Sequence, residues 1–206
     1  MKKIPMFLLL LGIVFGHLEA QQNTLSLKLN YSTATPLGSS FKDLVSKTSF
    51  AGFGAELSYR ISNQFSAGLE SGSQVFYEKF PRQLYKTTDG SDISAVVTNN
   101  VQTVPILLKG QYWFAPDKSV QPFLSLGLGG NIITYKQYAG EFSSDSKSKF
   151  GFAARPELGL FVPFRKGTPA GISVSAAYNY MPFNYAGITN LNSVSGRIGI
   201  SFPLEQ

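Results

Sequence analysis

Eight charged side chains that lie inside otherwise apolar stretches are the residues of this chain that could do chemistry. Three are glutamates, whose carboxylates could act as general acids or bases, and five are lysines or arginines, which could pair with them. Arranged along a bore, the same residues could instead line a narrow path for ions. The eight are Lys28, Glu56, Arg60, Glu70, Lys109, Arg155, Glu157 and Arg197.

The start of the chain has the layout of a secretory signal peptide. Lys2 and Lys3 form a charged beginning, an apolar run follows them, and Ala20 is a small residue suited to cleavage. The apolar run is shorter than the roughly 20 residues that a membrane-spanning helix needs, and a retained N-terminal anchor is the alternative. We therefore expect residues 1–20 to be a signal peptide and the mature domain to span residues 21–206.

The expected mature domain contains neither histidine nor cysteine, because the one histidine of the chain is His17 and cysteine is absent from the sequence. Zinc sites are built mainly from these two residue types, and Ser-His-Asp and Cys-His nucleophile systems need a histidine. We therefore expect the protein not to be an enzyme and to hold no metal or cofactor. A site made only of carboxylates, at Glu56, Glu70 or Glu157, is the open alternative.

The charge of the chain is modestly basic. It is +6 overall, and removal of the signal peptide leaves 16 basic and 11 acidic residues, a net charge of +5. The longest basic groupings are "KSK" at 147–149 and "RK" at 165–166. Such short groupings are typical of solvated loops, so we expect no nucleic-acid partner.

The segment "VPILLKGQYWF", residues 104–114, shows how one of the eight charges is positioned. In a β-strand, successive side chains point to opposite faces. One face then carries Val, Ile, Leu, Gly, Tyr and Phe, and the other carries Lys109 with Pro, Leu, Gln and Trp. The same alternation, with every one of the eight charges on a polar face, recurs in residues 25–32, 51–62, 65–75, 120–135, 150–162, 172–180 and 193–202.

Eight alternating segments predict a β-barrel, and two features favour a transmembrane barrel over a soluble barrel that binds a ligand in an apolar interior. A soluble surface carries roughly 25–35% charged residues, whereas the polar faces here are mostly Gly, Ser, Asn and Gln. The connections also alternate in length, as they do between the periplasmic and outer ends of transmembrane barrels. The short ones are 62–64, 115–119 and 164–170, and the long ones are 33–49, 77–100, 136–149 and 181–192.

The cost of placing charge in lipid predicts which face points inward. Lys or Arg on the lipid face near the midplane costs about 2–4 kcal/mol each, and five such residues lie inside the segments. We therefore expect an all-β fold, an eight-stranded antiparallel up-and-down transmembrane β-barrel with its charges in the bore. Aromatic residues near the segment ends predict two interfacial girdles, formed by Tyr31, Phe50, Tyr59, Phe65, Tyr77, Tyr112, Phe114, Tyr135, Phe150, Phe164, Tyr180, Phe183 and Phe202.

Three stretches carry a resemblance to a known family: "VPILLKGQYWF", "QPFLSLGLGGN" at 121–131 and "RPELGLFVPF" at 155–164. With them, residues 22–203 resemble the small outer-membrane beta-barrel domain proteins of Gram-negative bacteria, including PorT-like and porin-family members. The resemblance implies eight antiparallel strands and an outer-membrane location. It departs from the family where Phe202 is followed by "PLEQ" instead of ending the chain. Pro156 lies inside a strand and removes a donor there, so we expect a bulge or local irregularity.

For function, the residues favour a non-enzymatic barrel that is plugged by its own charges. Eight strands leave an interior that side chains just fill, so the eight charged residues would form a stabilising polar plug. A narrow porin-like ion path is the alternative use of the same residues. The resemblance to PorT-like proteins allows a further one, an accessory subunit of an outer-membrane secretion or assembly complex. The sequence indicates no ligand or oligomeric state.

The longest connection, residues 77–100, is the candidate binding loop. Long outer loops are where binding residues concentrate, and outer-membrane lipid together with a protein partner at these loops are the partners we expect. Alternatively, "SAVVTNN" within this connection simply extends the hairpin above the membrane. The candidate binding residues are Tyr77, Lys79, Phe80, Arg82, Tyr85 and Lys86.

Overall fold

The computed structural model describes residues 24–86, 92–139, 142–185 and 188–204. The signal peptide expected at residues 1–20 lies outside these ranges. Within them, helices long and apolar enough to cross a membrane are absent.

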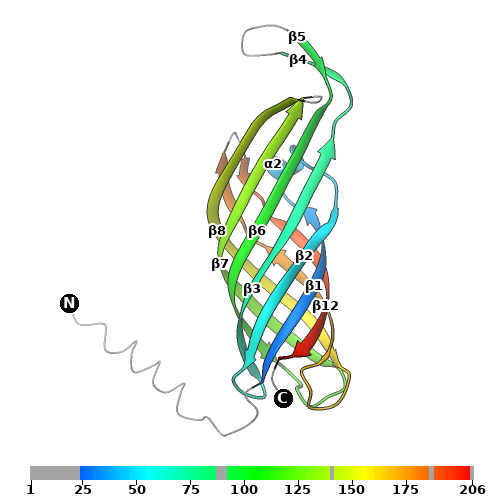
Figure 1. Ribbon diagram of the computed structural model, residues 1–206, viewed down its shortest axis with the longest axis vertical. Coiled ribbons are helices and arrows are strands. Elements are labelled where there is room, and N and C mark those ends of the chain that lie inside the picture. The colour runs from blue at the N-terminus through cyan, green and yellow to red at the C-terminus, as the bar shows by residue number, and fades with distance from the viewer. Residues whose placement is uncertain (1–23, 87–91, 140–141, 186–187, 205–206) are drawn as a thin grey trace, which may run out of the picture.

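Eight antiparallel strands close into a barrel in the order β1-β12-β9-β8-β7-β6-β3-β2 (Figure 1). Each segment predicted from alternation is one of these strands, and most strands run further toward the long connections than predicted. The strand neighbours in the barrel are neighbours in sequence, apart from the closing pair β1–β12. The strands are β1 (Leu25–Pro36), β2 (Ser49–Arg60), β3 (Phe65–Lys79), β6 (Val97–Trp113), β7 (Gln121–Ala139), β8 (Phe142–Pro163), β9 (Gly171–Asn179) and β12 (Ser193–Pro203).

The barrel turns its apolar face outward and its charges inward, as predicted. Leu108 and Lys109 are adjacent on β6, yet Leu108 is 68% exposed and Lys109 is 3% exposed. The girdle prediction is wrong for two of its thirteen aromatic residues, because the side chains of Tyr135 and Phe183 are buried, at only 8% and 9% exposed. Tyr135 lies on the inward parity of β7, and Phe183 lies in the short strand β10 (Pro182–Tyr185) inside the barrel mouth.

Pro156 interrupts one ladder without shifting its register. The pairing of β8 with β9 ends at Glu157 opposite Ala177, and an isolated bridge joins Ala154 to Tyr180 in the same register. Proline has no N–H to donate to the strand beside it, which accounts for the gap. The expected irregularity is therefore a break in the ladder and not a bulge.

Five minor elements lie in the long connections, at one end of the barrel. Helix α2 (Ser39–Lys42) follows β1, strands β4 (Gln83–Lys86) and β5 (Asp92–Ala95) pair as a hairpin, and β10 pairs with β11 (Ile188–Asn190). The β4–β5 hairpin stands clear of the barrel at the top of Figure 1. Because β3 and β6 stay paired up to Lys79 and Thr98, and β4 pairs with β5 beyond them, most of the 77–100 connection is an extended hairpin.

Candidate functional site in the barrel bore

Lys109 lies at the centre of the bore and contacts three of the four buried glutamates, Glu56, Glu70 and Glu157. Its Nζ atom is 2.8 Å from Glu56 Oε2, 3.3 Å from Glu70 Oε2 and 2.6 Å from Glu157 Oε2. These carboxylates come from three different strands, β2, β3 and β8. One lysine therefore ties four strands of the wall together through the interior.

Three further cations complete the cluster around the glutamates. Arg197 places Nη1 2.9 Å from Glu157 and Nη2 2.5 Å from Glu70. Arg155 Nη1 is 2.5 Å from Glu70, and Lys28 Nζ is 3.0 Å from Glu56. We call the seven residues the ionic belt: Lys28, Glu56, Glu70, Lys109, Arg155, Glu157 and Arg197.

Uncharged side chains from the remaining strands also bind the ionic belt. Ser125 of β7 and Ser175 of β9 donate hydrogen bonds to Glu157, at 3.3 Å and 2.5 Å. Arg155 donates from Nε to Asn179 Oδ1 on β9 at 2.6 Å. All eight strands thus contribute to one network, which gives the buried charges the partners they need in a low-dielectric interior.

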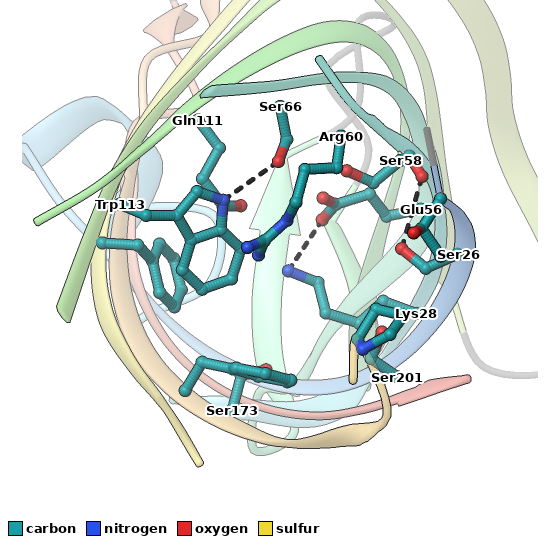
Figure 2. Close-up of a pocket in the computed structure, with 14 residues that line it drawn as sticks. Ser26, Lys28, Glu56, Ser58, Arg60, Ser66, Gln111, Trp113, Ser173 and Ser201 are labelled. Atoms are coloured by element: carbon teal, nitrogen blue, oxygen red, sulfur yellow. Dashed lines mark hydrogen bonds and ion pairs between the residues drawn. The ribbon is translucent and has the colours of Figure 1, made fainter. Parts of the chain in front are cut away.

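Arg60, the eighth predicted charge, lies apart from the ionic belt. Its guanidinium carbon is 4.6 Å from the centre of the Trp113 ring, a cation–π stack. The Trp113 indole N–H donates to Ser66 Oγ at 2.9 Å, and the ring packs against Phe123 and Phe161. Figure 2 shows this group, with Lys28 and Glu56 beside it. The sequence placed Arg60 on the inward face but not in this stack.

An apolar cluster closes the outer end of the bore, and the sequence did not reveal it. Phe41 of α2 and the nearby Val45 are fully buried there. The Phe41 ring packs edge-on against the Phe76 ring of β3, with 4.9 Å between the ring centres. We call this cluster the apolar lid: Ala34, Phe41, Val45, Phe76, Val101, Leu107, Ile133, Tyr135, Ala153, Met181, Phe183, Ile188 and Leu191. One signal was available, since Leu107 and Ile133 are apolar residues on the inward parity of their strands.

Polar contacts hold the loop part of the apolar lid to the wall. The carboxylate of Glu78 on β3 accepts hydrogen bonds from the Ser46 backbone N–H at 2.5 Å and from Ser46 Oγ at 3.0 and 3.1 Å. Asn99 Nδ2 on β6 donates to the Leu44 carbonyl at 3.0 Å. These bonds fix the loop between β1 and β2 over the bore.

The candidate binding residues of the 77–100 connection spread over three elements. Tyr77 and Lys79 were predicted to be loop residues, but they are exposed residues of strand β3. Phe80 and the exposed Arg82 lie between β3 and β4. Tyr85 and Lys86 belong to β4, and the structure describes their backbone only. Over the described ranges, histidine, cysteine and carboxylate residues form no group able to hold a metal ion.

Comparison with known proteins identifies the type of barrel. The sequence profile of the family described as outer membrane protein beta-barrel domain matches residues 6–202. Neisserial surface protein A (NspA) has a similar structure, with 16% identity, a TM-score of 0.56, and 86% of this chain and 95% of that chain covered.

Two weaker structural similarities are to barrels from other organisms. OprG from Pseudomonas aeruginosa has 14% identity and a TM-score of 0.45, over 88% of this chain and 97% of that one. Ail of Yersinia pestis, in complex with the heparin analogue sucrose octasulfate, has 14% identity and a TM-score of 0.45, over 87% of this chain and 97% of that one. Among the curated proteins compared, none matches the chain.

Proposed function

Because the chain belongs to the outer membrane protein beta-barrel domain family, we propose that it is a closed, non-enzymatic barrel whose outer elements make its contacts. The protein is integral to the outer membrane. One observation supports the proposal most strongly: the bore is occupied at two successive levels, by the ionic belt and by the apolar lid. An eight-stranded interior is just wide enough for side chains to fill it.

The positions of the glutamates also support a non-enzymatic role. A general acid or base must reach a substrate proton, within about 3 Å or through one water. Glu56, Glu70 and Glu157 are instead buried and held by cations from other strands of the wall. Their hydrogen-bonding capacity is used by the barrel itself.

Conductance in planar bilayers tests the closed bore. We expect the purified protein, folded by the criterion of heat-modifiable gel migration, to give no stable open channel. A variant with the loop part of the apolar lid removed, residues 38–47, should stay closed as well, because the ionic belt fills the bore beneath it. Stable channel openings in the unmodified protein would favour the narrow porin-like alternative and contradict the proposal.

A second candidate function is binding by the β4–β5 hairpin. Leu84 on β4 is 73% exposed, on a hairpin that stands beyond the barrel. Binding residues concentrate on projecting outer loops, and Leu84 offers an apolar contact point there. Deletion of residues 80–95 should leave membrane insertion intact and remove binding to whole cells or co-purifying proteins. Loss of insertion would show that the hairpin serves assembly.

Mild-detergent extraction then separates a surface-binding barrel from an accessory subunit. A barrel that works alone should migrate at the size of the chain with its micelle. Stable co-purification with secretion or assembly components would favour the accessory-subunit interpretation instead.

A further inference from the structure

A second compartment of the bore lies between the ionic belt and the end with the short turns. We call it the vestibule; it is lined by Lys28 and its ion-pair partner Glu56, by Arg60 and Trp113, and by a set of hydroxyls that includes Ser66, Ser173 and Ser201 (Figure 2). The space open to the centres of water molecules is about 30 Å³, enough for about two or three waters. In outer-membrane barrels the short-turn end faces the periplasm, so the vestibule opens there.

The bore contains more positive than negative charge. Five cations, those of the ionic belt and Arg60, face the three glutamates of the belt, and a fourth buried glutamate, Glu78, lies at the outer end of the bore. The ionic belt uses all three carboxylates for its own four cations. Among the described residues no carboxylate lies within ion-pair distance of Arg60, although Asp117 in the turn after β6 acts on it electrostatically from further away. A partly buried cation without a paired anion favours the entry of one.

The stack on Trp113 prepares Arg60 for this role. A guanidinium that lies on an aromatic face keeps its in-plane N–H donors free for a planar, bidentate acceptor. Ser66 accepts the indole hydrogen bond, and this leaves its own hydroxyl hydrogen for a ligand. Because Lys28 and Glu56 are paired with each other, the vestibule offers one positive charge without an ion-pair partner, that of Arg60, with donors around it.

We propose that the vestibule is a binding site for a single carboxylate group, with Arg60 as its counter-charge. A carboxylate matches the guanidinium fork, carries the one charge that Arg60 leaves unpaired, and fits a space of about two or three waters. The group could belong to a small free acid or to the end of a periplasmic peptide, and both present the same chemistry.

The single tryptophan of the chain makes the site directly measurable. Trp113 is the only tryptophan, so intrinsic indole fluorescence reports on the vestibule alone. The folded protein in a non-ionic detergent is titrated with iodide, an anionic quencher, with caesium, a cationic one, and with neutral acrylamide. We expect saturable quenching by iodide, little by caesium, and relief of iodide quenching by acetate but not by acetamide.

Three variants separate a built site from the general charge of this end of the barrel. Arg60→Gln should weaken iodide quenching at least about tenfold, the loss expected for a charge-assisted hydrogen bond, and should not lower acrylamide quenching, because the shorter side chain leaves the Trp113 ring at least as accessible. Arg60→Lys should retain part of the effect. Arg165→Gln removes the same charge from an exposed turn at the same end and should change nothing. Heat-modifiable migration confirms that each variant is folded.

The competing acid then identifies the source of the carboxylate. Stronger relief by triglycine than by acetate would indicate a peptide terminus, and equal or stronger relief by acetate would indicate a free acid; both uphold the site. Equal quenching by iodide and caesium, no effect of Arg60→Gln, or an equal effect of Arg165→Gln would overturn it.

Discussion

In the middle of the bore, seven charged side chains from six strands are joined by ion pairs, whereas at its outer end thirteen buried apolar side chains pack together. The ionic belt is built wholly from the wall. The apolar lid takes Phe41 and Val45 from a connection, and Met181, Phe183 and Leu191 from the β10–β11 region. A wall residue cannot leave its place without opening the barrel, but a connection can move alone. The two regions should therefore respond differently to mutation.

Replacement of Lys109 by Met should have the largest effect. It leaves Glu56, Glu70 and Glu157 with fewer cations in a buried site, and removing one partner of a buried ionic group costs about 3–5 kcal/mol. We expect the free energy of unfolding in lipid vesicles, followed by gel migration against urea, to fall by that amount. The matched control is Lys118→Met in an exposed turn, which should change it by less than about 0.5 kcal/mol. Equal effects of the two would mean that the ionic belt contributes no stability.

The same substitution, leucine to arginine, at two exposed positions compares the cost of a charge on the lipid face with its cost on the outer hairpin. Leu108 and Leu84 are similarly exposed, but Leu108 lies on the barrel wall and Leu84 on the hairpin beyond it. Leu108→Arg should lower the unfolding free energy by about 2–4 kcal/mol because its charge enters lipid. Leu84→Arg should leave it within about 0.5 kcal/mol. A small effect at Leu108 would place this part of β6 outside the hydrocarbon.

The sequence predicted the ionic belt better than the apolar lid for a physical reason. Strand alternation fixes which way Lys109 and Glu157 point, and a closed barrel of eight strands then brings inward charges together. It does not fix the contacts of Phe41, because that residue lies in a connection without a strand period. The stack of Arg60 on Trp113 was also beyond sequence reasoning, since it depends on strand register across the barrel.

Phe41→Ala tests whether the apolar lid opens by itself. Loss of a buried phenylalanine costs about 3–5 kcal/mol, which should appear as easier opening of the connection and not as global unfolding. The Asp43 and Val45 amides donate within this connection, and their hydrogen exchange should become faster by roughly 100-fold to several thousand-fold. Leu107→Ala removes a lid residue from wall strand β6 and should instead lower global stability by about 2–5 kcal/mol. Similar global losses in both variants would show that lid and wall unfold together.

The smallest expected effect is at the bond between lid and wall. Glu78→Gln removes the charge that accepts hydrogen bonds from the backbone N–H and the hydroxyl of Ser46, and hydrogen bonds to charged groups contribute about 1.5–3 kcal/mol. The glutamine oxygen can still accept one of these bonds, so we expect closure of the connection to weaken by about 1 kcal/mol. Exchange at Asp43 and Val45 should then rise several-fold while the unfolding midpoint stays unchanged. Lys79→Gln, on the exposed neighbour, should alter neither quantity. If exchange at these amides responds to Phe41→Ala but not to Glu78→Gln, apolar packing alone holds the apolar lid closed. The two regions would then differ fully in what holds them, ion pairs in the ionic belt and apolar contacts in the apolar lid.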